Sequence, residues 1–560
     1  MRFFRFVLAR SDKARTLLIA AAAVGGVSGA LSVALLGLIN RTLQEGGFDL
    51  PEAGLGTSFL VLCLMLTVAR VSTQQLLARV GQGMVMELRL SMTRQVLSSP
   101  LRKLEELGPH RVLATITEDV AALTQAMILV PIVTINGTIV VGTLVYLAFL
   151  SPKMFLMLLV LVVLGIAAYK IPSELAMARF RQSREYEDTL FAHFRSLTDG
   201  IKELKLHRAR RLGFVAQVED IATRMRALRI VAATLYGGAA ALGHLLFFLV
   251  IGGLLFLRPA WIAADWPTLV SYTIMLLYLM TPMQTFLDSV PILGRADIAV
   301  EKIERLGFAL AKAGVETMPS AGETSLPPGR VEVRDVVHAY HREGQQDRTF
   351  QIGPLSTVFE PGQVIFLVGG NGSGKTTLAK VLVGLYAPEG GQILVDGRAV
   401  DDANRSEYRE LFSAVFSDFH LFDRFLGLDH PERDEVARQY LDRLQLAHKV
   451  KVEEGGFSTT ELSLGQRKRL ALLTSFLEDR PLYLFDEWAA DQDPYFKEVF
   501  YKSILGELKR RGKTVIVISH DDRYFGEGDR LLKLEDGQLI FDGTYAEYED
   551  SLAAQASHPR

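Results

Sequence analysis

The segment VIFLVGGNGSGKTT, residues 364–377, is the most informative part of this chain. Val364 to Val368 predict a buried strand, and the glycine-rich run after them leads into a helix, so the segment matches G-x-x-x-x-G-K-[ST] in its required strand–loop–helix setting. In such a loop, successive backbone N–H groups converge on phosphate oxygens at a helix N-terminus. Lys375 then reaches the outer phosphates, and Thr376 supplies a hydroxyl to Mg²⁺. We expect further phosphate contacts from Asn371, Gly372, Ser373, Gly374 and Thr377.

Two later apolar runs end in polar residues that suit the same site. The run LYLFDE, residues 482–487, predicts a central strand that presents Asp486 to Mg²⁺ and Glu487 to an attacking water. An apolar strand ending in two acids is only moderately specific by itself, but its place about 110 residues after the phosphate loop strengthens the assignment. A third strand, 515–519, precedes His520, whose imidazole is a candidate contact for the outer phosphate. The alternative for His520 is a surface histidine with ordinary partners.

The first half of the chain is different in kind, because it holds the apolar runs that a membrane span needs. A bilayer core of about 30 Å takes roughly 20 apolar residues in a helix. Six runs of about this length occur before residue 290 and none after it. They are approximately 16–39, 55–70, 128–150, 154–169, 232–257 and 267–287.

Basic residues give the orientation of these spans. Lys and Arg concentrate in the N-terminal segment and in the stretches 81–127 and 170–230, which we therefore place on the cytoplasmic side, with both termini cytoplasmic. Both inner stretches also carry apolar residues at helical spacing, so we expect the spans to continue as helices beyond the bilayer and to turn near 100–109 and 196–205. Ionisable groups within spans are costly, so His244 and Asp288 are candidates for a substrate pathway.

The composition indicates two different domains in one chain and excludes several functions. The chain is 49% apolar, 22% charged and has a mean hydropathy of +0.21, which excludes a disordered protein. Residues 1–310 carry 31 Lys and Arg against 22 Asp and Glu, whereas residues 311–560 carry 30 against 41. The single cysteine, Cys63, excludes an internal disulfide and fits a reducing compartment. No basic patch interleaved with aromatics occurs, so we expect no nucleic acid partner.

The pentapeptide LSLGQ, residues 462–466, connects the two halves to a known family. Ser463 stands at a helix N-cap, and an ordinary capped helix would explain it. Its place just before the 482–487 strand, however, resembles the signature of ATP-binding cassette (ABC) proteins. With six preceding spans, the chain resembles an ABC half-exporter. The predicted architecture is a membrane helical domain (1–310), a linker (311–330), an α/β ATP-binding domain (331–545) and a tail (546–560).

This resemblance implies further site residues. Tyr340 matches the aromatic that stacks on adenine, and Asp493 matches the aspartate of the loop at the dimer interface. Since the signature acts on a partner's nucleotide in this family, Ser463, Gly465 and Gln466 would complete the ATP site of a second copy. A homodimer with ATP and Mg²⁺ as cofactors follows from the resemblance.

Two departures from the family pattern narrow the assignment. Ser417, in AVFSD (414–418), stands where the family has glutamine, so Mg²⁺ sensing would pass through Asp418 or through water, or be weaker. Ser417 and Asp418 are both candidates for the metal site. Leu464 replaces the central signature glycine. The Gly353–Pro354 pair, the GGNG form of the phosphate loop (369–372), FSAVFSD (412–418) and GQRKRLAL (465–472) are similar to the cyclic-peptide and siderophore exporter branch of the pyoverdine, syringomycin and microcin J25 type.

The resemblance implies an ATP hydrolase coupled to transport. We expect a multi-pass protein of the bacterial inner membrane, in contact with lipid, that exports a cyclic peptide, lipopeptide or siderophore precursor. The alternative is a general lipid or multidrug exporter or flippase. A soluble mechanochemical ATPase is disfavoured by the six spans, and an importer by the fusion of both domain types in one chain.

Overall fold

The computed structural model describes residues 3, 5–6, 12–44, 53–257, 265–312, 326–327, 329–340, 350–428 and 431–556. Contacts divide the chain into two units, one of Met1–Arg89 with Thr115–Ile303 and the other of Leu90–Ala114 with Glu304–Arg560. Residues 90–114 therefore belong with the ATP-binding unit by their contacts. Most of the expected linker, 311–330, lies outside the described residues, as does the end of the expected tail, 546–560.

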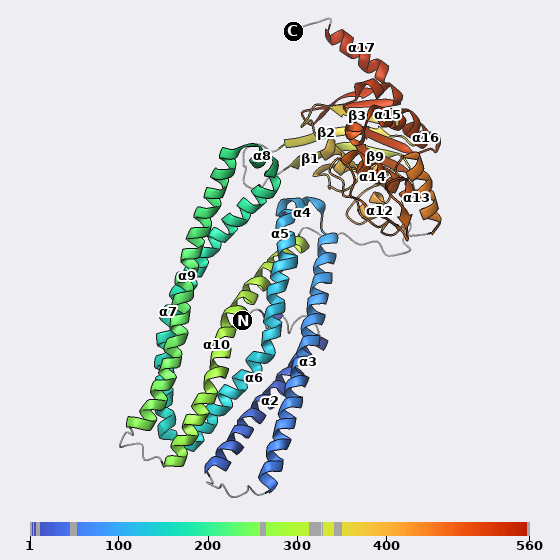
Figure 1. The fold of residues 1–560 in the computed structure, drawn as a ribbon. Helices are drawn as coiled ribbons and strands as arrows, with labels where there is room; N and C mark the ends of the chain where they lie inside the picture. The colour runs from blue at the N-terminus through green and yellow to red at the C-terminus, as the bar shows by residue number, and fades with distance from the viewer. Residues whose placement is uncertain are drawn as a thin grey trace. The chain divides into compact units, whose positions relative to one another are not determined.

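The first unit is built from long helices (Figure 1). In the described residues, six helical segments are long and apolar enough to cross a membrane, which confirms the predicted number of spans: Ile19–Thr42, Gly54–Leu97, Val112–Leu150, Pro152–Asp199, Arg208–Phe256 and Trp266–Phe286. The helices that contain them are α2 (Asp12–Gln44), α3 (Ala53–Leu97), α5 (Pro109–Ala114), η1 (Thr115–Asp119), α6 (Val120–Leu150), α7 (Pro152–Asp199), α9 (Arg208–Gly252), η2 (Gly253–Leu257) and α10 (Trp266–Lys312).

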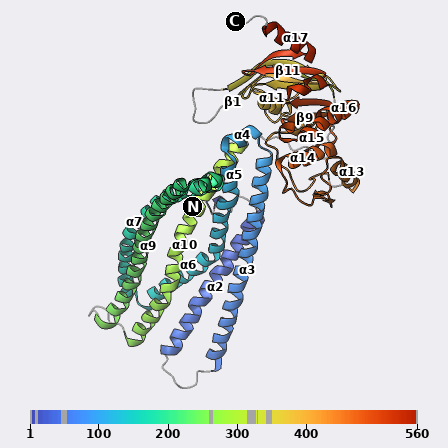
Figure 2. The same cartoon turned by 45° about the horizontal axis from the view of Figure 1, so that its top comes forward.

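Several of these helices are longer than a bilayer requires. Helix α7 has 48 residues, which corresponds to about 72 Å at 1.5 Å per residue. The two predicted turning points are confirmed as short helices between long ones, α4 (Leu101–Leu107) after α3 and α8 (Ile201–Leu206) after α7. Helix α7 packs along α9, and α2 packs along α6. The α7–α9 pair is visible in both Figure 1 and Figure 2.

The second unit contains two larger sheets and a short hairpin. A six-stranded sheet has the order β12-β11-β3-β10-β9-β6, with only β12 antiparallel to its neighbour, and a four-stranded antiparallel sheet has the order β2-β1-β4-β5. The strands are β1 (Val331–Tyr340), β2 (Phe350–Phe359), β3 (Val364–Gly369), β4 (Gly390–Val395), β5 (Arg398–Ala399), β6 (Phe412–Val415), β7 (Val452–Glu453), β8 (Gly456–Phe457), β9 (Leu482–Asp486), β10 (Thr514–Ile518), β11 (Arg530–Glu535) and β12 (Gln538–Gly543).

The helices of this unit cover the six-stranded sheet. Alternate residues of β3 enter different apolar clusters: Val364, Phe366 and Val368 belong to one, and Ile365 and Leu367 to the other. Because both faces are covered, the strand reads as one continuous apolar run. The helices are α11 (Lys375–Leu382), α12 (Arg405–Arg409), α13 (Pro431–Arg443), α14 (Leu464–Glu478), η3 (Trp488–Asp491), α15 (Pro494–Glu498), η4 (Val499–Ile504), α16 (Leu505–Arg510), η5 (Asp522–Glu527) and α17 (Tyr545–Ala556).

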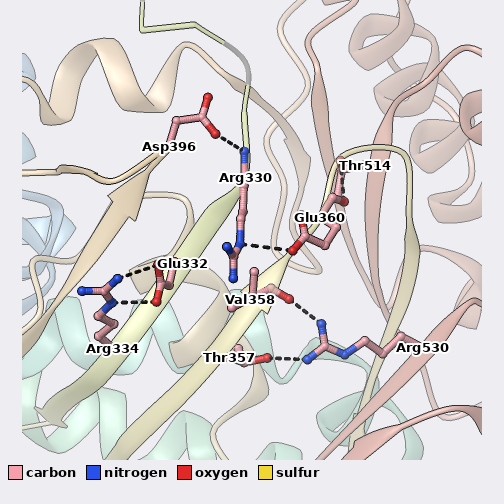
Figure 3. Close-up of polar contacts among 9 residues, drawn as sticks. All are labelled: Arg330, Glu332, Arg334, Thr357, Val358, Glu360, Asp396, Thr514 and Arg530. Atoms are coloured by element: carbon pink, nitrogen blue, oxygen red, sulfur yellow. Dashed lines mark hydrogen bonds and ion pairs between the residues drawn. The ribbon is translucent and has the colours of Figure 1, made fainter.

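Polar side chains join the two sheets (Figure 3). From β11, the guanidinium of Arg530 donates to the carbonyl of Val358 and, at 3.1 Å, to the hydroxyl of Thr357, both in β2. The same guanidinium forms an ion pair with Asp542 at 2.5 Å. At the start of β10, the Thr514 hydroxyl lies 3.4 Å from the Glu360 carbonyl. Arg530 therefore ties the four-stranded sheet to the edge of the parallel one.

We predict that Arg530→Met destabilises the ATP-binding unit. The substitution removes several hydrogen bonds of a partly buried cation, at a cost of about 2 kcal/mol, which lowers the unfolding temperature of a unit of this size by about 4–8 °C. Thermal unfolding of the purified full chain measures this. The control is Arg334→Met, which breaks an exposed ion pair with Glu332 in the same four-stranded sheet and leaves the unfolding temperature unchanged. Equal unfolding temperatures for the two variants would contradict the role of Arg530.

Candidate functional site

Three parallel strands bring the predicted site residues to one edge of the sheet. Strand β10 lies between β3 and β9, and Ile518 is level with Leu367 on one side and Asp486 on the other. The carboxyl ends of these strands carry the glycine-rich loop, the Asp486–Glu487 pair and His520. In open parallel sheets, ligands bind at this edge.

Two glycines of the loop have no room for a side chain. Gly369 has φ +152°, and a Cβ there would lie 2.2 Å from the carbonyl oxygen of Leu534. Gly374, with φ +99°, ends the loop as the N-cap of α11, and a Cβ would lie 2.6 Å from Ile352. Asn371 and Gly372 are exposed at the loop tip, whereas Ser373 is buried. Packing therefore requires glycine at 369 and 374, while the exposed tip of the loop leaves its backbone accessible to a phosphate.

Lys375 is the first residue of α11 and is only 6% exposed. Its Nζ donates to the carbonyls of Gly369 and Gly370, both at 2.9 Å. Burial lowers the pKa of Lys375, and the charges of Glu487 and Asp486 only partly oppose this effect. A buried ammonium group is stabilised by a nearby anion, as a polyphosphate would provide.

Asp486 has the surroundings of a metal ligand. It is 1% exposed, and burial raises the pKa of its carboxyl group. Its Oδ2 accepts from the Thr376 hydroxyl at 3.1 Å and lies 3.4 Å from the Ser417 hydroxyl, whereas Oδ1 has no hydrogen-bond partner among the described residues. One carboxylate and two hydroxyls at a phosphate loop fit Mg²⁺, which prefers oxygen ligands and keeps most of its other positions for phosphates and water.

The departure at position 417 has a structural consequence. Ser417 lies beside Asp486, as the prediction of a metal-shell residue requires, while Asp418 is exposed and makes no hydrogen bond or ion pair with the residues that the structure describes. Of the two side chains expected near Mg²⁺, the geometry therefore brings Ser417 to the site.

The two predicted catalytic residues contact each other. His520 Nε2 lies 3.2 Å from Glu487 Oε1, and the side chains are 46% and 38% exposed. Glu487 directly follows β9, and its φ of +51° puts it in the left-handed region. A carboxylate and an imidazole that remain accessible at the phosphate edge can hold a water molecule and a terminal phosphate.

The signature segment begins α14. Ser463 has the extended backbone of an N-cap but its hydroxyl makes no capping hydrogen bond, and the adjacent Leu464 is 50% exposed. The Gly465 carbonyl accepts from Gln492 Nε2 at 2.9 Å, which ties the helix start to the loop after the catalytic acid. Gln466 is partly exposed. The Ser463 hydroxyl thus remains available to an outside ligand.

Two residues assigned by resemblance have different outcomes. Asp493 caps α15 by accepting from the backbone N–H of Phe496 at 3.0 Å, and it accepts from Arg469 at 2.8 Å. Its carboxylate is thus held within its own chain while staying 50% exposed. Tyr340 is the last residue of β1, and its side chain lies outside the described part of the structure.

Short helix α4 contacts the helix that follows the phosphate loop. Glu105 accepts from Lys380 of α11 at 2.9 Å and from the Tyr386 hydroxyl. Arg102 forms an ion pair with Glu389. The chain between α3 and α5 is therefore attached to the ATP-binding unit through charged groups.

In the membrane unit, the two candidate pathway residues have partners on a neighbouring helix. His244 of α9 lies 3.0 Å from Gln284 of α10, and Asp288 of α10 accepts from the Tyr236 hydroxyl of α9 at 3.0 Å. These bonds form a polar contact between α9 and α10. They fit a helix-packing role as well as a pathway role.

A cavity of about 490 Å³ lies between α3 and α6. Its polar lining includes Arg70, Gln74, Gln82 and Asn136, with apolar residues such as Met127 and Ile135 beside them. Sequence reasoning treated Arg70 only as the end of an apolar run and did not select the two glutamines. Arg70, with Gln74 and Gln82 following it after an apolar run, was the signal available for them.

Comparisons with known proteins agree with this geometry. The ABC transporter family model matches residues 352–490, and the ABC transporter transmembrane region model matches residues 16–286. The chain is 36% identical over 530 residues to the ATP-binding protein SyrD of Pseudomonas syringae pv. syringae, covering 92% of this chain and 93% of the relative. It is 27% identical over 505 residues to an ATP-dependent lipid A-core flippase of Pseudomonas aeruginosa, covering 86% and 80%.

A solved structure shares the fold. A bacterial Atm1-family ABC exporter with ATP bound superposes with a TM-score of 0.75 at 17% identity, covering 99% of this chain and 100% of that chain. With six apolar spans, an ABC transporter transmembrane region and bacterial relatives, this is a bacterial membrane protein that binds ATP. The chain therefore belongs to the ABC transporters, as a half-exporter in which one membrane domain is fused to one ATP-hydrolysing domain.

Proposed function

We propose that this ABC exporter moves a cyclic peptide, lipopeptide or siderophore precursor from the cytoplasm across the bacterial inner membrane. The observation that carries the proposal is the cavity between α3 and α6, in which Arg70 and the amides of Gln74, Gln82 and Asn136 interrupt an apolar lining. Amides and a guanidinium suit the carbonyl and carboxylate groups of a peptide, and the apolar remainder suits an acyl or aromatic group.

The sequence identities to known relatives support the proposal of peptide or siderophore export. Identity to SyrD is 36%, against 27% for the lipid A-core flippase of Pseudomonas aeruginosa. The second candidate is a lipid or multidrug exporter or flippase, which those flippase relatives favour and which would use the same ATP-driven motor. His244 and Asp288 are proposed as part of the pathway in either case.

In the ATP site, we propose a role for each residue. Lys375 and the backbone of residues 371–377 hold the phosphates, and the family resemblance assigns adenine stacking to Tyr340. Thr376, Asp486 and Ser417 would hold Mg²⁺, with Asp418 reaching it through water. Bound Mg²⁺ would neutralise charge on the phosphates. Glu487 orients the attacking water, and His520 contacts the outer phosphate.

A second copy completes each site. ABC half-transporters generally form dimers, and the hydroxyl of Ser463 is not used for capping in its own chain. We infer a homodimer in which Ser463, Gly465 and Gln466 of one chain contact the ATP held by the other, with Asp493 in the loop between the two sites. ATP drives transport in this arrangement to the extent that it binds the closed dimer more tightly than the open one.

The proposed orientation follows the basic residues. Both termini and the ATP-binding unit face the cytoplasm, and α4 transmits movement of α11 toward the membrane helices through Glu105 and Lys380.

Removing the phosphate-loop ammonium tests the ATP site. We predict that Lys375→Ala weakens ATP binding about 10- to 100-fold, because charged hydrogen bonds contribute about 1.5–3 kcal/mol. Equilibrium binding of a fluorescent ATP analogue to the purified full chain measures this. Lys502→Ala, which breaks an exposed ion pair with Glu498, is the control and binds normally. Normal affinity in Lys375→Ala would rule out the phosphate-loop assignment.

The role of Glu487 predicts a separation of binding from hydrolysis. Glu487→Gln binds ATP and accumulates as the closed dimer, while steady-state hydrolysis falls about 10²- to 10⁴-fold because the water loses its carboxylate. The matched control, Glu498→Gln, hydrolyses ATP at the normal rate. Undiminished turnover in Glu487→Gln would refute the assignment.

Cargo class is tested by ATPase stimulation in liposomes. We expect a bacterial cyclic lipopeptide to raise the hydrolysis rate of the reconstituted protein above the rate in phospholipid alone, with Glu487→Gln as the inactive control. Stimulation by lipid A and not by the lipopeptide would support the flippase alternative instead.

A further inference from the structure

We propose that Lys468 is a positioning residue for ATP hydrolysis, which fixes the backbone of Glu487 and thereby the direction of its carboxylate. Lys468 lies in the second turn of α14 and is only 3% exposed. It is therefore a charged residue in the interior of the ATP-binding unit. The inference rests on the role proposed above for Glu487.

The contacts of Lys468 converge on the segment that carries the catalytic acid. Its Nζ donates to the carbonyl oxygen of Glu487 at 2.8 Å and forms an ion pair with Asp491 at 2.7 Å. Its own carbonyl accepts from Trp488 Nε1 at 2.7 Å. One residue of α14 thus contacts three residues of the short segment 487–491. These acceptors fix the position of the buried ammonium group, because a buried charge without a partner has a large free-energy cost.

Glu487 needs this support because of its backbone conformation. It has φ +51° and ψ +35°, a left-handed conformation that is unfavourable for a residue with a side chain. Its N–H donates to the Ile518 carbonyl of β10 at 3.0 Å, and its carbonyl accepts from Lys468 Nζ at 2.8 Å and from the Ala490 N–H at 3.3 Å. The peptide groups on both sides of its Cα are therefore anchored. This fixes the direction of the Cα–Cβ bond and leaves the carboxylate 3.2 Å from His520.

The side chains of Trp488 and Asp491 help to hold the same segment. Trp488 is 2% exposed and stacks on Phe500 with ring centroids 4.5 Å apart. Asp491 is 43% exposed, so its carboxylate balances the charge of Lys468 from the solvent side. In the described structure, Lys468 is the side chain that donates a hydrogen bond to the Glu487 carbonyl.

The other end of α14 offers a control with the same chemistry. Asp479, which ends the helix, is also left-handed, with φ +48°. Lys513 donates to its carbonyl at 3.1 Å and pairs with its carboxylate at 2.9 Å. This lysine is 15% exposed and lies at the opposite end of the helix from the phosphate edge. A role limited to fastening α14 would make the two lysines equivalent for hydrolysis.

The experiment compares Lys468→Met with Lys513→Met in the full chain, reconstituted in nanodiscs. Methionine keeps the length of the side chain and removes its donors and charge. We expect Lys468→Met to lower kcat about 10- to 100-fold, as misplacement of a catalytic group does, while KM for ATP changes less than about threefold. Lys513→Met should keep kcat within about twofold of the unmodified chain. A normal kcat in Lys468→Met overturns the proposal.

A double variant tests whether Lys468 acts through Glu487. If it does, Lys468→Met with Glu487→Gln hydrolyses ATP at the residual rate of Glu487→Gln alone, because groups that act as a unit are not additive. Multiplied losses in the double variant would instead indicate general damage and overturn the proposal. Should Lys468→Met not purify, Asp491→Asn removes only the exposed counterion. It should lower kcat with KM unchanged, and a normal kcat overturns the proposal.

The same measurements separate this inference from the proposed function. If Glu487→Gln itself retains full turnover, the role of Glu487 is wrong. If Glu487→Gln is inactive while Lys468→Met is normal, only the positioning role of Lys468 fails.

Discussion

The burial of one carboxylate, Asp486, constrains the whole ATP-binding unit. A carboxyl group that is 1% exposed at the end of a central strand is unfavourable unless hydroxyls and a cation surround it. The nearest hydroxyl, that of Thr376, comes from a helix 110 residues earlier in the chain. The two meet only because β10 lies in parallel register between β3 and β9. The apolar clusters on both faces of the sheet keep that register rigid.

This arrangement explains why the ATP-binding elements were predictable from sequence. Strands buried on both faces, such as 364–368 and 482–485, read as short apolar runs, and the glycines at 369 and 374 stand where the backbone leaves no space for a side chain. The six spans were equally clear, since a bilayer imposes both length and composition. In each case a physical requirement restricts the residue types within one short stretch of sequence, so that stretch alone is enough to predict the element.

Other features depend on tertiary packing, which the sequence motifs do not specify. The approach of Glu487 to His520 follows from strand order, which no single motif encodes. Whether His244 faces a pathway or a neighbouring helix depends on the rotation of α9, and the structure pairs it with Gln284. The lining of the membrane cavity by Arg70 arises from the packing of α3 against α6. Residues 90–114 read as part of the membrane half by sequence, yet their contacts are with the ATP-binding unit.

The attachment of α4 to α11 has a mechanical consequence. Lys380 follows Lys375 by five residues, which is about 7.5 Å along the helix axis. One short helix therefore carries both the proposed phosphate-binding lysine and the contact with Glu105, with no loop between them. If α11 unwound locally, we would expect ATP hydrolysis to become uncoupled from transport, although Lys375 and the Glu105–Lys380 contact residues remained unchanged.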